Sequence, residues 1–243
     1  MCSSLPSEIL DLIADHLHDE PDTLKACSLI SKSWVPRARR HLFAHVEFGS
    51  TIQPWIGAFP DPSSSPAHHT RTLRIRDLGS VTAAGPGVGH WIRAFHSVVH
   101  LHLDSSCDRY GNPVSLFHGL SPAVKSLHLY LIPIPYLEIF DFVCSFPLLE
   151  DFIFSPSGYE GDADIWIAPL TSPRLTGLLE LEGTIAGIRF IVRRMLDFPN
   201  SLHFTKIVLA GLSGMDFESI TSLVSRCSDT LESLNVAEEL IGA

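Results

Sequence analysis

Residues 5–43 decide how the N-terminal part of this chain folds. They read LPSEILDLIADHL over 5–17, TLKACSLISKSW over 23–34 and PRARRHLF over 36–43. Within the first two parts, apolar residues recur three or four positions apart, which is the spacing of one face of an α-helix. Pro6 suits the first turn of a helix, and Glu20, Pro21 and Asp22 form a turn between the first two parts. The stretch therefore predicts three short helices.

This helical segment carries more large apolar side chains than a unit of its size can bury. Chains of about forty residues rarely bury enough surface to be stable alone. One solution is that the helices dock onto the rest of the chain. The other is that part of their apolar face belongs to a partner protein.

The order of the residues in this segment resembles an F-box. The pattern LPxEILxxIxxxL runs from Leu5 to Leu17, and LxxCxLISKxW runs from Leu24 to Trp34. In that family, three helices bind a Skp-type adaptor, which joins them to the cullin scaffold of a ubiquitin ligase. Ser31 stands where the family often has cysteine. The resemblance implies that these residues face the adaptor: Leu5, Pro6, Ile9, Leu10, Ile13, Leu24, Ile30 and Trp34. An ordinary helical core is the other explanation of the same pattern.

The composition is that of a globular protein inside a cell. Apolar residues make up 45% of the 243 residues, and no apolar run reaches the ~18 residues of a membrane span. The first thirty residues hold no continuous apolar segment, so we expect no signal peptide. The five cysteines are scattered, without a Cys-x-x-Cys pair, which indicates reduced thiols. We therefore expect a cytoplasmic or nuclear protein that has no membrane partner.

The net charge argues against a nucleic-acid partner. Residues 1–76 hold equal numbers of basic and acidic side chains, so the formal charge of −10 comes entirely from residues 77–243. Binding nucleic acid requires cationic groups that displace counterions from the phosphates. The one basic concentration, Lys32 to Arg40, is interpreted as the solvated side of the third helix.

Beyond a Pro/Ser-rich stretch at 57–66, the chain repeats itself. An apolar-x-x-apolar-x-apolar pattern recurs, in places imperfectly, and its middle position falls at residues 73, 101, 127, 152, 178, 207 and 234. Successive middle positions are 25 to 29 residues apart, and a repeat of this length indicates stacked structural units. Segments with helical spacing lie between several copies, and Ile188 to Leu196 carry the clearest stripe. Alternation of strand and helix predicts parallel strands with helices on the outside.

We therefore predict an α/β protein with three regions. Residues 1–45 form the small three-helix unit that resembles an F-box, and residues 46–69 form a connecting segment and linker. Residues 70–243 form a curved parallel-strand solenoid with outer helices and about seven strands. This region resembles an irregular leucine-rich-repeat domain, although the usual asparagine after each strand is missing. Only seven residues follow Val236, so we expect either a truncated product or an end that something else covers.

Alternation along the strands predicts a binding face. The paired apolar residues point into the core, and the residues between and before them point to the concave face. The candidates for binding a protein target are Arg74, His100, His102, His128, Asp151, Ile153, Leu179, Lys206 and Val208. Ile153, Leu179 and Val208 are expected to lie side by side as an apolar stripe, which either a partner or a later segment of the chain would cover.

No motif supports catalysis, a metal or a cofactor. His102 and His128 occupy equivalent positions of successive repeats, but the sequence supplies no third or fourth ligand at metal-binding spacing. Gly85 to Gly89 lack the Gly-Lys-Ser/Thr element of a phosphate loop. We expect a non-catalytic substrate-recognition subunit of a Skp–cullin–F-box type ubiquitin ligase, with an unidentified protein target. The alternative is an interaction scaffold with leucine-rich repeats and no ligase role.

Overall fold

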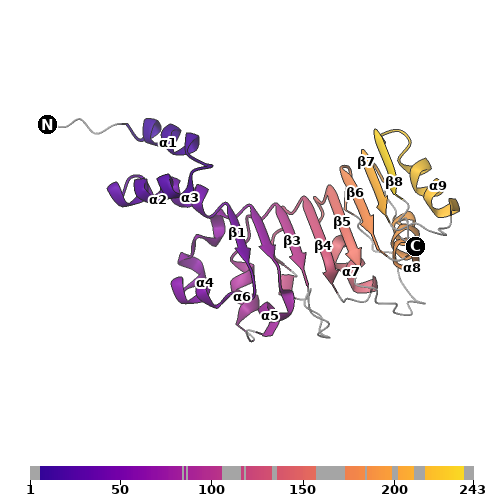
Figure 1. Ribbon diagram of the computed structural model, residues 1–243, viewed down its shortest axis with the longest axis horizontal. Coiled ribbons are helices and arrows are strands. Elements are labelled where there is room, and N and C mark those ends of the chain that lie inside the picture. The colour runs from indigo at the N-terminus through magenta and orange to yellow at the C-terminus, as the bar shows by residue number, and fades with distance from the viewer. Residues whose placement is uncertain are drawn as a thin grey trace, which may run out of the picture.

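The chain forms an α/β structure around one parallel sheet (Figure 1). A computed structural model describes residues 6–83, 85, 87–105, 116–117, 119–132, 136–156, 173–183, 185–198, 202–210 and 217–237. Within these ranges, the sheet contains eight strands in the order β1 to β8, and every neighbouring pair is parallel. The strands stand in a curved row, and α1 to α3 project beyond its β1 end. The predicted α/β class with parallel strands is confirmed.

In the described residues, helices lie between most of the consecutive strands. The strands are β1 (His45–Phe48), β2 (Thr72–Ile75), β3 (His100–Asp104), β4 (Ser126–Ile132), β5 (Asp151–Pro156), β6 (Leu178–Glu182), β7 (Lys206–Ala210) and β8 (Ser233–Ala237). The helices are α1 (Ser7–His16), α2 (Pro21–Ile30), α3 (Val35–Leu42), α4 (Gln53–Ala58), α5 (Leu78–Ala83), α6 (Val88–Arg93), α7 (Tyr136–Cys144), α8 (Ile185–Leu196) and α9 (Phe217–Arg226). Two short 3-10 turns, η1 (Pro62–Ser64) and η2 (Pro66–His69), precede β2.

A row of aligned apolar side chains builds the core. Val46 pairs with Leu73, Leu73 with Leu101, and the row continues through Leu127, Phe152, Leu179, Ile207 and Leu234. Most of these side chains pack in one cluster with buried residues of the helices, such as Ile92 of α6 and Ile191 of α8. The helices therefore cover one face of the sheet and leave the other face open.

Backbone hydrogen bonds between neighbouring repeats recur at equivalent positions, as the apolar side chains do. The residue just before each strand donates its N–H to the equivalent carbonyl of the preceding repeat, for example Val99 to Arg71 at 2.8 Å and Lys125 to Val99 at 2.8 Å. The same bond continues at Glu150, Gly177, Thr205 and Glu232. The N–H groups of each repeat thus bond to carbonyl groups of the repeat before it. Stacked units of this kind share both a core and a ladder of backbone hydrogen bonds.

The sheet begins earlier than predicted. The predicted repeat strands are preceded by one more, because His45–Phe48 form β1 and pair with Thr72–Ile75. Phe48 and Ile52 are buried in the main core, and Phe48 meets Phe95 edge to face at 5.8 Å between ring centroids. The segment therefore contributes the first strand and part of the core.

The predicted strand alignment is shifted by one residue at β6. Leu179 and Leu181 are buried, and Glu180, not Leu179, is the partner of Ile153. One extra residue separates the buried Leu175 from the strand, and Leu175 adopts a left-handed backbone with φ of 40°. Because neighbouring residues of a strand point to opposite faces, a shift of one residue exchanges the two faces.

The N-terminal helices have a small core of their own. Ala14 of α1, Leu24 of α2 and Ala38 of α3 are fully buried against Leu17, Trp34 and Leu42. This cluster is separate from the core of the sheet. Its links to the sheet are the chain from α3 into β1 and the contact of α3 with η2. In the part of the chain described, no helix is long and apolar enough to cross a membrane.

Candidate protein-interaction surfaces

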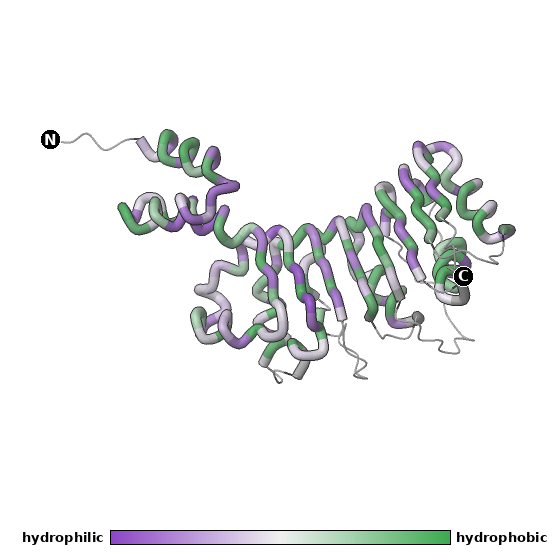
Figure 2. The backbone as a smooth tube through the Cα atoms, in the orientation of Figure 1, coloured by the Kyte–Doolittle hydropathy of each residue, from purple (hydrophilic) through white to green (hydrophobic). Residues whose placement is uncertain are grey.

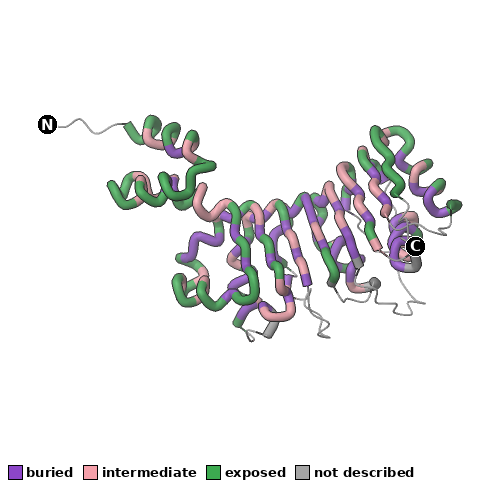
Figure 3. Tube along the Cα trace, in the orientation of Figure 1, coloured by how far each residue is buried: buried purple, intermediate pink, exposed green. Residues whose placement is uncertain are grey.

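Helices α1 and α2 expose large apolar side chains to solvent. Leu29 is 86% exposed, Ile30 is 75% exposed and Leu12 is 57% exposed, and Ile9 and Ile13 are also exposed. Figure 2 shows apolar stretches on both helices, and Figure 3 shows that most residues of both helices are exposed. We call Ile9, Leu12, Ile13, Leu29 and Ile30 the helical apolar surface. Ile9, Leu12 and Ile13 share one face of α1, and Leu29 and Ile30 are adjacent on α2. Exposed apolar groups that lie close together mark a site where another molecule binds.

The structure places the predicted adaptor-facing residues at different depths. Pro6, Ile9, Ile13 and Ile30 are exposed, and Leu10 and Trp34 are half-buried. Leu24 does not face solvent, because it is 1% exposed and forms the centre of the small helical core. Its expected position on the surface is therefore wrong, and its role is to support the helices from inside. Leu5 lies outside the described residues.

Two exposed residues of this surface, Leu12 and Leu29, are absent from the predicted set. The helical spacing of Leu12 with Ile9 and Ile13 could have indicated it, since residues three and four apart share a face. Leu29 lies beside Ile30 near the end of α2. Its exposure depends on where the next helix begins, which is a tertiary feature that helical spacing does not encode.

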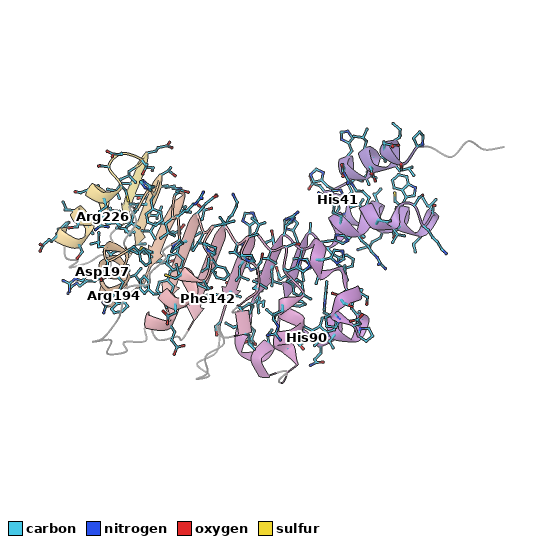
Figure 4. The ribbon with its side chains drawn as sticks, turned by 180° about the vertical axis from the view of Figure 1, so that it is seen from behind. His41, His90, Phe142, Arg194, Asp197 and Arg226 are labelled. Atoms are coloured by element: carbon cyan, nitrogen blue, oxygen red, sulfur yellow. The ribbon has the colours of Figure 1, made fainter. Side chains whose placement is uncertain are left out.

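An ionic link between α1 and α3 holds this surface in place. Arg37 donates from Nε to Asp15 Oδ1 at 2.7 Å, and its Nη2 donates to Oδ2 of the same carboxylate. The imidazole of His41, labelled in Figure 4, lies 2.7 Å from Asp15 Oδ1 through its Nε2. The hydrogen bond from Arg37, followed by that from His41, holds the pKa of Asp15 well below its ordinary value. Together these bonds fasten α1, which otherwise shares only a very small core with α3.

The open face of the sheet is the second surface. Its central row runs across the strands from Glu47 and Arg74 through His102, His128 and Ile153 to Glu180, Val208 and Asn235. A parallel row begins at His45 and Thr72, continues through His100, Ser126 and Asp151, and ends at Lys206 and Ser233. We call these two rows the sheet face. Its first half carries Arg74 and the imidazoles together with Glu47, and Asp151 and Glu180 add carboxylates on β5 and β6.

The middle of the sheet face holds a close pair of imidazoles. The ring centroids of His102 and His128 lie 3.9 Å apart, with an angle of 44° between the planes. Burial, and after it the neighbouring His102, lowers the pKa of His128 to about 4. Burial, followed by Arg74, also lowers the pKa of His102. At neutral pH both rings are therefore uncharged, which allows them to pack against each other without repulsion.

Charged residues flank this pair. Arg74 Nη2 lies 3.0 Å from Asp104 Oδ2, which joins β2 to β3 beside the imidazoles. Another ion pair, Lys125 Nζ to Glu150 Oε1 at 2.7 Å, lies just before β4 and β5, outside the two rows of the sheet face. The centre of the sheet face is thus polar and internally paired, so it can recognise a partner by shape and hydrogen bonding more readily than by net charge.

Most of the predicted target-binding residues lie on this face. Arg74, His100 and Lys206 are exposed, and His102, His128, Asp151, Ile153 and Val208 are half-buried there. Leu179 is buried in the core, so its assignment to the face is wrong. The expected apolar stripe is therefore broken, because Glu180 stands between Ile153 and Val208. Glu180 is the residue that the prediction missed, because the run LLELE at 178–182 allows two alignments of the strand.

Asp151 has a structural role in addition to its place on the face. Its Oδ1 accepts a hydrogen bond from the Leu178 N–H at 2.7 Å. A Cβ atom added to Gly177 would lie 2.1 Å from the same oxygen. The carboxylate therefore stabilises the irregular entry into β6, and the glycine makes room for it.

Burial disfavours ionisation of two cysteine thiols. Burial raises the pKa of the Cys144 thiol to about 12 and also raises the pKa of Cys227. A thiol must ionise to act as a nucleophile or a metal ligand. In the described ranges, no three His, Cys, Asp or Glu side chains are grouped so that they could hold a metal ion. Compared with family models, curated proteins and solved structures, the chain matches none.

Proposed function

We propose that this protein is the substrate-recognition subunit of a Skp–cullin–F-box type ubiquitin ligase. The N-terminal helices bind a Skp-type adaptor, and through it a cullin, while the sheet face binds a protein target. The observation that carries the proposal is the helical apolar surface, on which Leu29 and Ile30 are 86% and 75% exposed. It lies on a segment whose residues follow the order of an F-box.

Burial and exposure in the helices fit this role. The small inner core of Ala14, Leu24 and Ala38 keeps the three helices together, and the larger apolar residues remain available outside it. A helical unit that used these residues for its own stability would have buried them, because each side chain contributes about 1.5–3 kcal/mol on burial. A partner that covers them recovers that free energy as binding.

The second part of the proposal is that the repeats form an irregular leucine-rich-repeat solenoid with an open target face. The repeating backbone ladder and the aligned apolar row support a repeat architecture. The subunit itself is non-catalytic in this account and needs no cofactor. It acts by holding the target close to the ubiquitin-loaded enzyme, which raises their effective concentration. Such a protein works in the cytoplasm or the nucleus.

The proposal is tested by reconstitution. The full chain is mixed with a purified Skp-type adaptor and a cullin, and the mixture is separated by size-exclusion chromatography. We expect the three proteins to elute together, and the cullin not to bind this chain when the adaptor is omitted. A complex with the adaptor that excludes the cullin would instead favour the alternative, an interaction scaffold without a ligase role. A folded chain that binds no adaptor would reject the adaptor role.

A further inference from the structure

A cavity on the helical side of the sheet lies near its N-terminal end. It has a volume of about 450 Å³, and the residues that give it chemical character are Asp61, Ser63, His68, His90, Arg93 and His96. They come from η1, η2 and α6 with the turn that follows it, so distant segments of the chain meet here. Figure 4 labels His90, on the helical side of the sheet. Neither the sheet face nor the helical apolar surface includes any of these residues.

The lining of this cavity is basic, in contrast to the chain as a whole. One arginine and three histidines face a single carboxylate, Asp61, whereas the whole chain carries a formal charge of −10. Asp61 is engaged within its own turn, since Ser63 N and Ser63 Oγ donate to its carboxylate at 3.0 and 2.7 Å. Hydrogen bonds from Ser63 hold the pKa of this carboxyl below its ordinary value.

Two further basic residues lie near η2, outside the lining of the cavity. His69 follows His68 in η2, and its pKa is lowered by burial, then by His68, Arg40 and Arg39. Both arginines belong to α3, which packs on η2, and both are exposed.

Hydrogen bonds hold two parts of the cavity wall. The His68 Nδ1 atom lies 3.0 Å from the Ser65 carbonyl oxygen, so this nitrogen carries the proton and donates to that oxygen. The Ser121 hydroxyl donates to the His96 carbonyl at 2.8 Å, which ties the end of the α6 segment to the next repeat.

We propose that this cavity binds a phosphate monoester, carried either by a free small molecule or by a phosphorylated side chain. The guanidinium of Arg93 matches the oxygen geometry of phosphate, and imidazole N–H groups of the histidines that line the cavity can donate to the remaining oxygens. A metal cation fits less well, because the arginine repels it. The volume lies within the range of small-molecule sites, and the acidic remainder of the chain disfavours an extended polyanion. This inference does not depend on the proposed ligase role.

The test is calorimetric titration of the full chain at low ionic strength with inorganic phosphate, phenyl phosphate and a short phosphoserine peptide. We expect saturable binding of phenyl phosphate, weakened about tenfold by Arg93→Gln through loss of a charge-assisted hydrogen bond. Arg76→Gln is the matched control, because Arg76 is an exposed arginine that pairs with Glu47 at 2.6 Å on another part of the molecule. Circular dichroism verifies that both variants are folded.

The three probes also separate the two sources of the phosphate. Tighter binding of the phosphopeptide than of phenyl phosphate assigns the cavity to a phosphorylated protein, and equal or weaker binding assigns it to a small molecule. The proposal is overturned if no probe binds saturably to the wild-type chain. It is equally overturned if Arg93→Gln and Arg76→Gln have the same effect on affinity.

Discussion

At the scale of single residues, the imidazole pair on the sheet face has the most unusual chemistry. His102 and His128 lie on neighbouring strands with their rings 3.9 Å apart. Such contact is favourable only while the rings are uncharged, and partial burial keeps them so. Protonation of either ring at low pH therefore disfavours this contact on the sheet face.

The pKa of His128 gives a direct prediction. Its value of about 4 in the folded chain is below the ordinary value of 6.5, so the unfolded chain binds this proton more readily. The stability that neutral His128 provides is fully present above pH 6.5 and is lost progressively as the pH falls toward 4. Between pH 6.5 and 4.5, the unfolding free energy of His128→Gln should fall by less than that of the wild type. Urea denaturation at each pH measures both values. An NMR titration that placed the His128 midpoint near 6.5 would contradict this explanation.

Asp15 is the residue on which the position of α1 depends. Its carboxylate joins α1 to Arg37 and His41 of α3, and its pKa is lowered by those hydrogen bonds. The link is therefore fully formed above the unfolded pKa of about 3.9 and weakens as the pH falls through the lower folded value. At neutral pH we expect Asp15→Asn to speed amide hydrogen exchange in α1.

Asp19→Asn is the control for this change. Asp19 is an exposed carboxylate that contacts only the nearby His18, at 3.1 Å, among the described residues. Its substitution should leave the exchange rates of α1 close to those of the wild type. If both variants accelerated exchange equally, net charge would explain the effect and the Asp15 link would not.

At the scale of elements, the entry into β6 is where the repeat departs from regularity. Leu175 has a left-handed backbone, and the Leu178 N–H is bonded by Asp151. We predict that Gly177→Ala lowers the unfolding free energy by about 1–3 kcal/mol, because the new methyl group displaces the Asp151 carboxylate from that N–H. Urea denaturation measures the change.

Two further variants make this prediction specific. Gly57→Ala lies in α4, where an added Cβ atom meets nothing within 4 Å, and it should be neutral or stabilising by up to about 1 kcal/mol. In an Asp151→Ala background, Gly177→Ala should cost little, because the displaced carboxylate is already gone. An equal cost of Gly177→Ala in both backgrounds would show that Asp151 does not mediate the effect.

The same element shows how far the sequence could predict this fold. The parallel strands and their spacing were predictable, because each repeat places apolar residues at fixed offsets that face a shared core. At β6 the run LLELE satisfies the alternation in either of two alignments. The choice between them depends on Leu175 and on the Asp151 bond, which are tertiary features. The strand signal at β1 is weak, because only four residues beside a helical segment carry it.

The candidate surfaces were predictable to a similar extent. Alternation placed His102 and His128 on the open face, and the structure brings them together. Helical spacing indicated Ile9 and Ile13, which are exposed. Spacing could not separate Leu24 from these residues, because it identifies a shared apolar side without showing whether that side meets another helix of the same chain or solvent.

At the scale of the whole molecule, the two surfaces belong to two separately packed regions. The helical apolar surface lies at the projecting N-terminal end (Figure 1), and the sheet face extends over the repeats toward β8. The helices and the sheet have separate cores, joined through α3, η2 and β1. A partner bound at one end and a target bound along the face would thus be held by one polypeptide, as the proposed function requires.

The most direct test of the central proposal is the affinity of the full chain for a purified Skp-type adaptor, measured for wild type, Ile30→Asp and Phe217→Asp. Ile30 and Phe217 are 75% and 79% exposed, so neither change should unfold the chain, and Phe217 lies on α9, in the last described repeat. If Ile30 is buried against the adaptor, Ile30→Asp should weaken binding at least about tenfold, whereas Phe217→Asp should bind like the wild type. Equal affinities for all three proteins would contradict the assignment of the helical apolar surface to the adaptor.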